Sequence, residues 1–311
     1  MATISSQRKP LTNTLAVATL ATLCCALWGS AVPGVRLGYQ LFAISSSDVG
    51  SQLIFAGSRF FFAGLAVLIV FQAHTHAPRL GSHFILNALE LGAFQTYGQY
   101  VLYYIGLAHA TGVTGSLIQG VGVFAMPLFS CFVFRLEKMT ARKVLGGVLG
   151  FLGLIISMEI GASTQFGWGE ALMLSGTICS TMATALMRQK SQHLNPIQLT
   201  GWQFVLGGIG LVLTGLLLGG AFTLNSWAAA GILAWLVFVS AAAFSIWSLL
   251  LRDNDISRIA PYQFFIPIFG VLISLLTLGA EGAEVGVNTV IALILISLGI
   301  IIVNRSPKQT S

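Results

Sequence analysis

The sequence predicts an all-α polytopic membrane protein with ten transmembrane helices, arranged as two inverted five-helix repeats. Three observations lead to this fold class. Hydrophobic residues make up 56% of the 311 residues and charged residues only 8%, whereas soluble domains carry roughly 25% charged residues. The basic residues fall almost entirely on one side of the predicted helices. The two halves of the chain also share short segments at a nearly constant offset.

Ten apolar runs follow one another, and most are long enough to cross a bilayer core of roughly 30 Å as helices. The run after the basic N-terminal residues is too long for a secretory signal, so we interpret it as the first transmembrane helix. Short connections leave no room for a sizeable domain outside the membrane, so the function must reside in the helices. The runs are predicted at residues 14–35, 49–72, 83–107, 112–134, 142–158, 168–188, 197–219, 227–251, 258–279 and 286–303. The predicted units are a tail at 1–13, repeats at 14–158 and 159–304, and a tail at 305–311.

The distribution of basic residues predicts the orientation. Alternate connections place thirteen Lys and Arg residues on one side and only Arg36 on the other, with Arg59 inside the second run. The positive-inside rule therefore predicts cytoplasmic termini in a plasma membrane. The net charge of +6 does not indicate nucleic-acid binding, because the basic residues lie in short loops. The four cysteines show no metal-ligand spacing, and we predict neither a metal nor a cofactor.

An internal repeat emerges when the halves are compared. Each half holds five runs, and an odd number of crossings forces the second copy into the membrane upside down. Inverted repeats are typical of secondary transporters, whose substrate site lies near the midplane between the halves. The matched segments are Pro127 with Pro267 at an offset of 140, Arg59-Phe60 with Gln203-Phe204 at 144, and Gly153 with Gly299 at 146.

Arg59 is the most unusual residue of the second run, because it falls near the middle of an apolar segment. A guanidinium at that depth costs roughly 2.5–3.5 kcal/mol on insertion scales. Two interpretations compete. The arginine either snorkels or closes a structural ion pair, or it lines a polar pathway within the membrane.

The third run is the most polar and supplies a partner for this arginine. Glu90, Phe94, Tyr97 and Tyr104 share one helical face, with Tyr100 beside it. A lipid-facing helix would not carry a carboxyl group and several amides, so we expect this face to point into the bundle. We interpret the deeper Tyr97 and Tyr100 as candidates for a substrate pocket.

The estimated heights of Arg59 and Glu90 differ by less than ~10 Å, which makes Glu90 the predicted partner. Structurally, this would be a buried ion pair in which loss of either member leaves an uncompensated charge. Functionally, Arg59 would bind a substrate carboxylate, while Glu90 would bind and release a proton during transport. The two roles are compatible.

Other residues are candidates for movement or for lining the pathway. Pro33 is predicted to break the first run towards its outer end, and Pro127 and Pro267 do the same in related places of the two halves. We interpret the three prolines as candidate hinges. Gln119 and Gln203 are further polar residues that could contact a substrate.

These features together resemble the EamA-type family of the drug/metabolite transporter superfamily. The resemblance covers about residues 17–304. It implies a bacterial plasma-membrane carrier, often an exporter of amino acids or other small metabolites, with a central cavity and alternating access. The halves depart from a strict repeat, because Glu137 lies ten residues after Pro127 and Glu281 fourteen after Pro267. The resemblance rests on Trp28-Gly29-Ser30, Arg59-Phe60, Thr111–Ile156 with Pro127, Glu137 and Gly146-Gly147, and Ser257–Asn304 with Pro267, Glu281 and Gly299.

The functional hypothesis is a secondary transporter, an exporter of a small metabolite such as an amino acid, with possible proton coupling. Its expected partners are the lipid bilayer and a small-molecule substrate. No glycine-rich phosphate loop followed by Lys-Ser/Thr points to ATP. The alternatives are an intramembrane enzyme, for which no catalytic constellation is present in the sequence, and a lipid-handling or scaffold protein with a lipid-facing groove.

Overall fold

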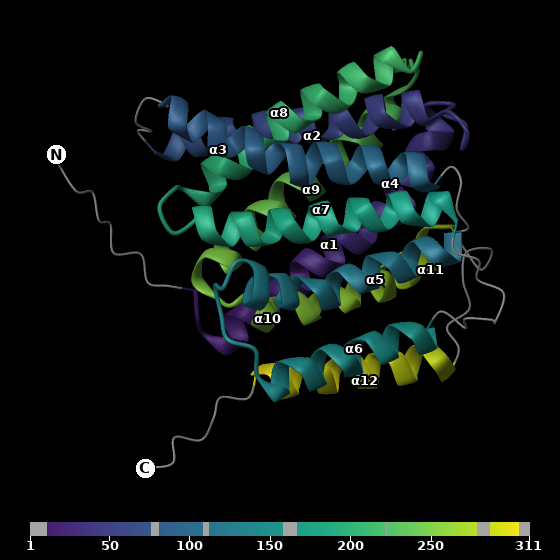
Figure 1. The fold of residues 1–311 in the computed structure, drawn as a ribbon. Coiled ribbons are helices and arrows are strands. Elements are labelled where there is room, and N and C mark those ends of the chain that lie inside the picture. The colour runs from purple at the N-terminus through teal and green to yellow at the C-terminus, as the bar shows by residue number, and fades with distance from the viewer. Residues whose placement is uncertain are drawn as a thin grey trace, which may run out of the picture.

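The computed structural model describes residues 11–75, 81–107, 112–157, 167–221, 223–278 and 287–304, and within these ranges it contains helices and connections but no strand. The helices lie side by side and make ten crossings (Figure 1). Five crossings are single long helices: α1 (Thr14–Leu41), α2 (Val49–His74), α7 (Trp168–Lys190), α8 (Pro196–Leu217) and α9 (Trp227–Asp253). These five are long and apolar enough to span a membrane. Two more are α6 (Ala141–Ser157) and α12 (Val287–Asn304). The all-helical, ten-crossing fold class is therefore confirmed.

The remaining three crossings are composite. The third runs through α3 (Ser82–Gly92), the π-helical segment η1 (Ala93–Gly98) and α4 (Gln99–Leu107). The fourth joins α5 (Gly112–Leu128) to the π-helical segment η2 (Phe129–Val133). The ninth begins with the short α10 (Ile256–Ile259) and the 3₁₀ segment η3 (Ala260–Phe264), and continues as α11 (Phe265–Leu278).

Polar caps fix where several of the long helices begin. Asn13 accepts hydrogen bonds from the first turn of α1, and Asn195 does the same for α8, where Pro196 follows at the first helical position. Asp48 accepts a hydrogen bond from the Ser51 backbone N–H at 2.9 Å, and its interactions with Ser51 lower the pKa of the Asp48 carboxyl group. The cap of α2 therefore stays ionised at neutral pH.

The three prolines occupy different helical contexts. α1 continues through Pro33 without interruption, so the predicted break in the first crossing is wrong. Pro127 lies inside α5, directly before the π-helical turn of η2. Pro267 is the third residue of α11, where a missing backbone N–H costs no intrahelical bond within that helix. The prolines of the two halves are thus not structurally alike.

A glycine seam holds α2 against α8 and reveals the symmetry of the fold. The glycines recur every seven residues in both helices, and the two helices run antiparallel. A Cβ atom built on Gly57 would lie 2.8 Å from the Gly208 carbonyl oxygen, and one on Gly64 would lie 2.6 Å from that of Gly201. Only glycine permits this approach of the backbones. The seam consists of Gly50, Gly57 and Gly64 facing Gly215, Gly208 and Gly201.

This seam corrects the predicted alignment of the two halves. Gly57 faces Gly208 at the centre of an antiparallel pair, so these residues correspond at an offset of 151. The alignment of Arg59 with Gln203 at an offset of 144 is therefore wrong by seven residues, which is two helical turns. The cause is the heptad spacing of the glycines, because a shift of seven places glycine on glycine again.

The helix pairing follows the same symmetry throughout the bundle. When the halves are exchanged, the contact of α4 with α7 becomes that of α9 with α1, and the contact of α1 with α11 becomes that of α7 with α5. The contact of α3 with α8 becomes that of α9 with α2. For each of these helix contacts, the symmetry-related contact is also present. The pairs α2–α8 and α6–α12 map onto themselves, and α6 and α12 lie together at one edge (Figure 1). The two inverted five-helix repeats are thus visible in the packing.

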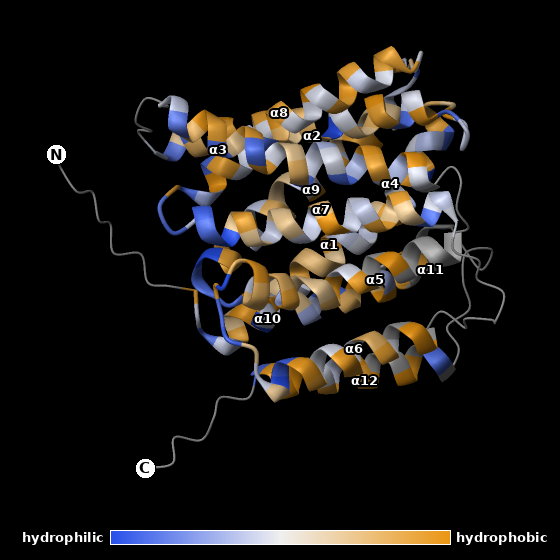
Figure 2. Ribbon diagram, in the orientation of Figure 1, coloured by the Kyte–Doolittle hydropathy of each residue, from blue (hydrophilic) through white to orange (hydrophobic). Residues whose placement is uncertain are grey.

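Charged residues gather at one end of the bundle, which we call the basic end and define by Lys143, Lys190, Arg252 and Arg258. Hydrophilic connections stand out there beside the apolar helices (Figure 2). Arg258 joins the two ends of the described chain, because Nη2 donates to the Thr12 carbonyl oxygen at 3.1 Å and Nε to Asn304 Oδ1 at 3.1 Å.

Glu137 links the two halves at the basic end. It lies in the connection between η2 and α6, and its side chain is only 2% exposed. The carboxylate accepts a hydrogen bond from Lys143 Nζ at 2.6 Å and another from the Ser257 backbone N–H at 3.1 Å. The Ser257 hydroxyl donates to it as well. A carboxylate from the first half thus accepts both donors of Ser257, which lies in α10 of the second half.

Replacing Glu137 by alanine is expected to destabilise the folded protein by about 3–5 kcal/mol, because the loss of this buried carboxylate leaves Lys143 and the two donors of Ser257 without their shared acceptor. Thermal unfolding of the detergent-solubilised protein measures this. The matched control is Glu90→Ala, which removes the half-exposed carboxylate of the Lys190 pair and should cost no more than about 1 kcal/mol. Equal losses in both variants would contradict the assignment of Glu137 as a link between the halves.

Candidate functional site

Arg59 lies eleven residues into α2 and is buried, with 7% of its surface exposed. Nη2 donates a long hydrogen bond to the Tyr100 hydroxyl at 3.4 Å, and Cζ lies 4.3 Å from the centre of the Phe60 ring. Nε is buried without a hydrogen-bond partner. No ion pair to Arg59 occurs among the residues that the structure describes. This guanidinium is thus held mainly by aromatic rings, without a counter-charge from the described part of the chain.

Phe60 and Tyr100 contact this arginine, and ring contacts continue from them to aromatic side chains of five helices, which we call the aromatic cluster. The ring of Phe60 lies 4.7 Å from Tyr100, 5.0 Å from Phe204 and 6.4 Å from Phe244. Trp28 extends the cluster, because its ring lies 5.1 Å from Phe244. The members are Trp28 and Tyr39 of α1, Phe60 of α2, Tyr100 and Tyr104 of α4, Phe204 of α8, and Phe244 and Trp247 of α9.

The predicted ion pair between Arg59 and Glu90 is wrong. Glu90 Oε2 instead accepts from Lys190 Nζ at 2.6 Å, and the Glu90 side chain is 47% exposed. Asn87 also accepts from Lys190, which ends α7 at the basic end. Glu90 is therefore paired, but in a half-exposed pair near a helix end rather than at the buried arginine.

The error in the predicted pair comes from the lengths of the helices. Tyr100, the hydrogen-bond partner of Arg59, lies ten residues beyond Glu90 along one continuous crossing. At ~1.5 Å per residue this separates Glu90 from the level of the arginine by roughly 15 Å. Helix α2 also runs for 26 residues, or about 39 Å. Heights estimated from a 30 Å crossing therefore placed both groups too close to the same level.

The π-helical segment η1 explains why the residues predicted to share one polar face of the third crossing do not all point into the bundle. A π-helical turn takes in an extra residue and rotates the helix that follows it relative to the helix before it. Tyr97 is accordingly 37% exposed, and its hydroxyl lies 3.1 Å from Thr214 Oγ1 of α8. Tyr100 turns towards Arg59 instead, and the Tyr104 ring lies 5.9 Å from that of Tyr100. Of the two tyrosines predicted for the pocket, the structure brings only Tyr100 to the arginine.

Of the two candidate glutamines, the structure describes the side chain of Gln203 alone, and its hydrogen-bond partner is Thr96 rather than Arg59. Gln203 is buried, and its Oε1 accepts from Thr96 Oγ1 at 2.6 Å, so it ties α8 to η1. By the 151-residue correspondence it matches Gln52, which is buried as well and donates to the carbonyl oxygens of Ser45 and Ser46. Gln119 lies in α5, but its side chain falls outside the described residues.

Sequence reasoning predicted only Tyr100 of the aromatic cluster as a pocket residue, and three of the missed members show why. Tyr39 falls beyond the predicted end of the first run, because α1 extends to Leu41. Tyr104 resembles an interfacial tyrosine in the sequence, yet it is 7% exposed. Phe244 lies within an apolar run and carries no sequence signal of its own. A helix-contact pattern would have been needed to find it.

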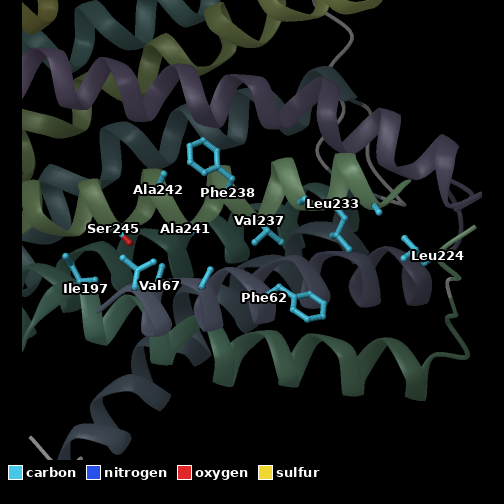
Figure 3. A pocket seen from close by; sticks show the side chains of 14 residues that line it. Phe62, Val67, Ile197, Leu224, Leu233, Val237, Phe238, Ala241, Ala242 and Ser245 are labelled. Carbon is cyan, nitrogen blue, oxygen red and sulfur yellow. The ribbon is translucent and has the colours of Figure 1, made fainter. Parts of the chain in front are cut away.

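A separate groove lies between α2 and α9 (Figure 3). Its volume is about 740 Å³, and thirteen of its fourteen lining residues are apolar, with Ser245 as the exception. Phe62 and Phe238 flank it. Val237 and Ala241 line it and also pack against the core beside the aromatic cluster. The groove and the cluster are thus neighbours that Val237 and Ala241 of α9 both contact, but Arg59 does not line the groove.

Comparisons with known proteins agree with this architecture. The EamA-like transporter family model matches residues 15–158 and 167–305. The uncharacterized transporter YvbV of Bacillus subtilis is 27% identical, with 82% of this chain and 83% of that protein covered. A protein of Salmonella typhimurium named as a probable amino-acid metabolite efflux pump is 22% identical, with 84% and 86% covered. A solved crystal structure superposes with a TM-score of 0.75 at 16% identity, over 94% of this chain and 97% of that one, and shares the fold.

The family model matches once in each half, and each match spans one set of five crossings. The relatives are named as transporters rather than enzymes. A multi-pass helical membrane protein built from two inverted repeats fits both findings. The chain belongs to the EamA-like transporter family of the drug/metabolite transporter superfamily.

Proposed function

We propose that this transporter exports a small metabolite bearing an anionic group, that it works by alternating access, and that Arg59 binds the anion. The observation that carries the proposal is the buried guanidinium of Arg59, which has no carboxylate partner among the described residues. An intramembrane cation is expensive unless a counter-charge reaches it. A substrate carboxylate would supply that charge reversibly, and Arg prefers it because the guanidinium can form two parallel hydrogen bonds with it.

The fold supports the transport part of the proposal. Arg59 belongs to α2, which packs along the antiparallel glycine seam with α8 at the symmetry axis of the two halves. Substrate sites of inverted-repeat transporters lie near the midplane at such an interface. Rocking of one half against the other would expose the arginine to each side in turn. Pro33, Pro127 and Pro267 remain proposed hinges for that motion, and the repeat boundaries at 14–158 and 159–304 remain part of the proposal.

The test is uptake into proteoliposomes with a panel of labelled carboxylates, amines and neutral metabolites, with and without a pH gradient. Arg59-dependent movement of at least one anionic substrate is expected. Acceleration by the gradient would support proton coupling, and its absence would remove coupling from the proposal. Transport of amines or neutral compounds alone would contradict an anionic substrate.

We further propose that the protein sits in a bacterial inner membrane with the basic end facing the cytoplasm. Thirteen of the fifteen basic residues fall on that side by sequence, and the positive-inside rule assigns it to the cytoplasm. A fluorescent reporter that matures only in the cytoplasm, fused after Ser311, should be bright. A dark but expressed fusion would contradict this orientation.

The apolar groove between α2 and α9 favours a second candidate, a lipid-handling protein. Ala234 lines the groove and is exposed, so Ala234→Phe would fill it without touching Arg59. Under the transport proposal this variant keeps its carboxylate transport within about twofold of the wild type, because an exposed, groove-filling substitution leaves the buried site intact. Transfer of a fluorescent lipid by the wild type and by Ala234→Phe is measured in the same proteoliposomes. Lipid movement that Ala234→Phe abolishes, without any carboxylate transport, would favour the lipid-handling function instead.

A further inference from the structure

Two buried N–H groups of the aromatic cluster have no hydrogen-bond partner among the described residues: Nε of Arg59 and Nε1 of Trp28. Both groups can only donate. Buried polar groups without partners cost about 1–3 kcal/mol each. A ligand that satisfies this set must therefore bring acceptors, and beside a guanidinium the fitting acceptor is a carboxylate.

The unpartnered donors belong to one continuous layer of rings. Trp28 packs on Phe244, Phe244 on Phe60, and the guanidinium of Arg59 lies over the face of Phe60. Trp247 extends this layer, with its ring 5.1 Å from that of Trp28. A ligand whose carboxylate reaches Arg59 would lay its apolar body along these rings. Planar groups gain most there, since offset and edge-to-face ring contacts are favourable.

A charged amine has no comparable place in the cluster. Each of the six acids that the structure describes lies at a helix end or in a connection and is engaged there, none with Arg59. The remaining acids, Glu159, Glu281 and Glu284, lie outside the described residues, in sequence between α6 and α7 and between α11 and α12. An ammonium group brought beside the guanidinium would be desolvated without a described carboxylate of the protein to pair with, and it would be repelled by the neighbouring guanidinium charge.

We infer that the substrate is a monocarboxylate with a planar apolar body and no ammonium group, rather than an amino acid. The inference rests on the proposed function, because it specifies what accompanies the carboxylate bound by Arg59. The inference predicts different affinities for two compounds that share a phenyl ring and a carboxylate and differ only in the amine, namely 3-phenylpropionate and L-phenylalanine.

The experiment measures binding to the purified full-length protein and counterflow in proteoliposomes, using 3-phenylpropionate, L-phenylalanine and 2-phenylethylamine. We expect 3-phenylpropionate to bind at least about tenfold more tightly than L-phenylalanine, because an unpaired buried ammonium costs more than the ~1.4 kcal/mol that corresponds to tenfold. 2-Phenylethylamine should neither bind nor move. Arg59→Gln should abolish the binding of 3-phenylpropionate.

A pair of tryptophan variants tests the donors directly. Trp28→Phe keeps a ring but removes the unpartnered N–H, and should weaken 3-phenylpropionate binding about 3–10-fold. Trp235→Phe is the matched control, because Trp235 is 42% exposed and lies outside the cluster; its binding should be unchanged.

Four outcomes separate this inference from the proposed function. The expected ranking with Arg59 dependence supports both. L-Phenylalanine binding as tightly as 3-phenylpropionate, with both lost in Arg59→Gln, overturns the inference and leaves the proposed function standing. Binding of neither carboxylate, while another anion of the panel is transported in an Arg59-dependent way, also overturns the inference alone. Binding that survives Arg59→Gln overturns both.

Discussion

Replacing Arg59 by leucine is expected to reduce transport of the anionic substrate on the order of 100-fold or more, while the folded protein becomes no less stable. Loss of the guanidinium removes the counter-charge for the carboxylate. It also removes a buried cation that costs roughly 2.5–3.5 kcal/mol to insert. No described carboxylate pairs with Arg59, so its removal leaves no buried anion unpaired among the described residues.

The measurement pairs transport in proteoliposomes with thermal unfolding of the same preparation. Glu90→Gln is the control, because it removes the charge of an acid that pairs with Lys190 about 15 Å along the helix from the arginine's level. It should transport normally and lose at most about 1 kcal/mol of stability. A fall of several kcal/mol in the stability of Arg59→Leu would show instead that the arginine holds the fold together.

Replacing Gly57 by alanine is expected to destabilise the protein by about 1–3 kcal/mol, although alanine is ordinarily the better helix former. The added Cβ would lie 2.8 Å from the Gly208 carbonyl oxygen and 2.8 Å from the Val212 backbone nitrogen. Backbone atoms cannot give way as a flexible side chain does, so α2 and α8 would have to move apart at the symmetry axis. Transport should fall along with stability.

Gly231→Ala is the matched control for this prediction. Gly231 also lies inside a transmembrane helix, yet a Cβ atom there would meet nothing within 4 Å. This variant should be neutral or slightly stabilised. Thermal unfolding compares the two, and equal effects would mean that the glycine seam does not depend on close backbone approach.

The fold could be predicted from the sequence because its causes are local. Apolar runs show where the helices lie. The one-sided distribution of Lys and Arg supports their number, because a missed or added helix would scramble it. The ends were harder to predict. α1 extends to Leu41, six residues beyond the predicted limit at 35, because amphipathic residues such as Tyr39 continue a helix past the apolar run. That extension hid a member of the aromatic cluster.

The site could be predicted only in part. Arg59 was conspicuous, since a charge inside an apolar run is visible in the sequence alone. Its neighbours were not, because they depend on helix packing and on the rotation introduced by η1. That π-helical segment leaves Tyr97 exposed and brings Tyr100 to the arginine. No periodicity rule anticipates where a helix will take in an extra residue.

The repeat shows a different limit. The inverted topology could be inferred from counting crossings, but the register between the halves could not. Glycines spaced by seven allow two alignments, and the structure selects the one that places Gly57 opposite Gly208. Gln52 then corresponds to Gln203, while Arg59 has no charged counterpart, because position 210 is a glycine. The proposed anion-binding group therefore belongs to the first half alone.

The most direct test is a structure of the protein with the best-transported carboxylate bound. We expect a carboxylate oxygen within roughly 2.7–2.9 Å of a guanidinium nitrogen of Arg59, the distance of a charge-assisted hydrogen bond. The apolar body should lie along Phe60 and Phe244. A carboxylate bound elsewhere, for example at the groove between α2 and α9 or beside Lys190, would contradict the assignment of Arg59 as the anion-binding residue.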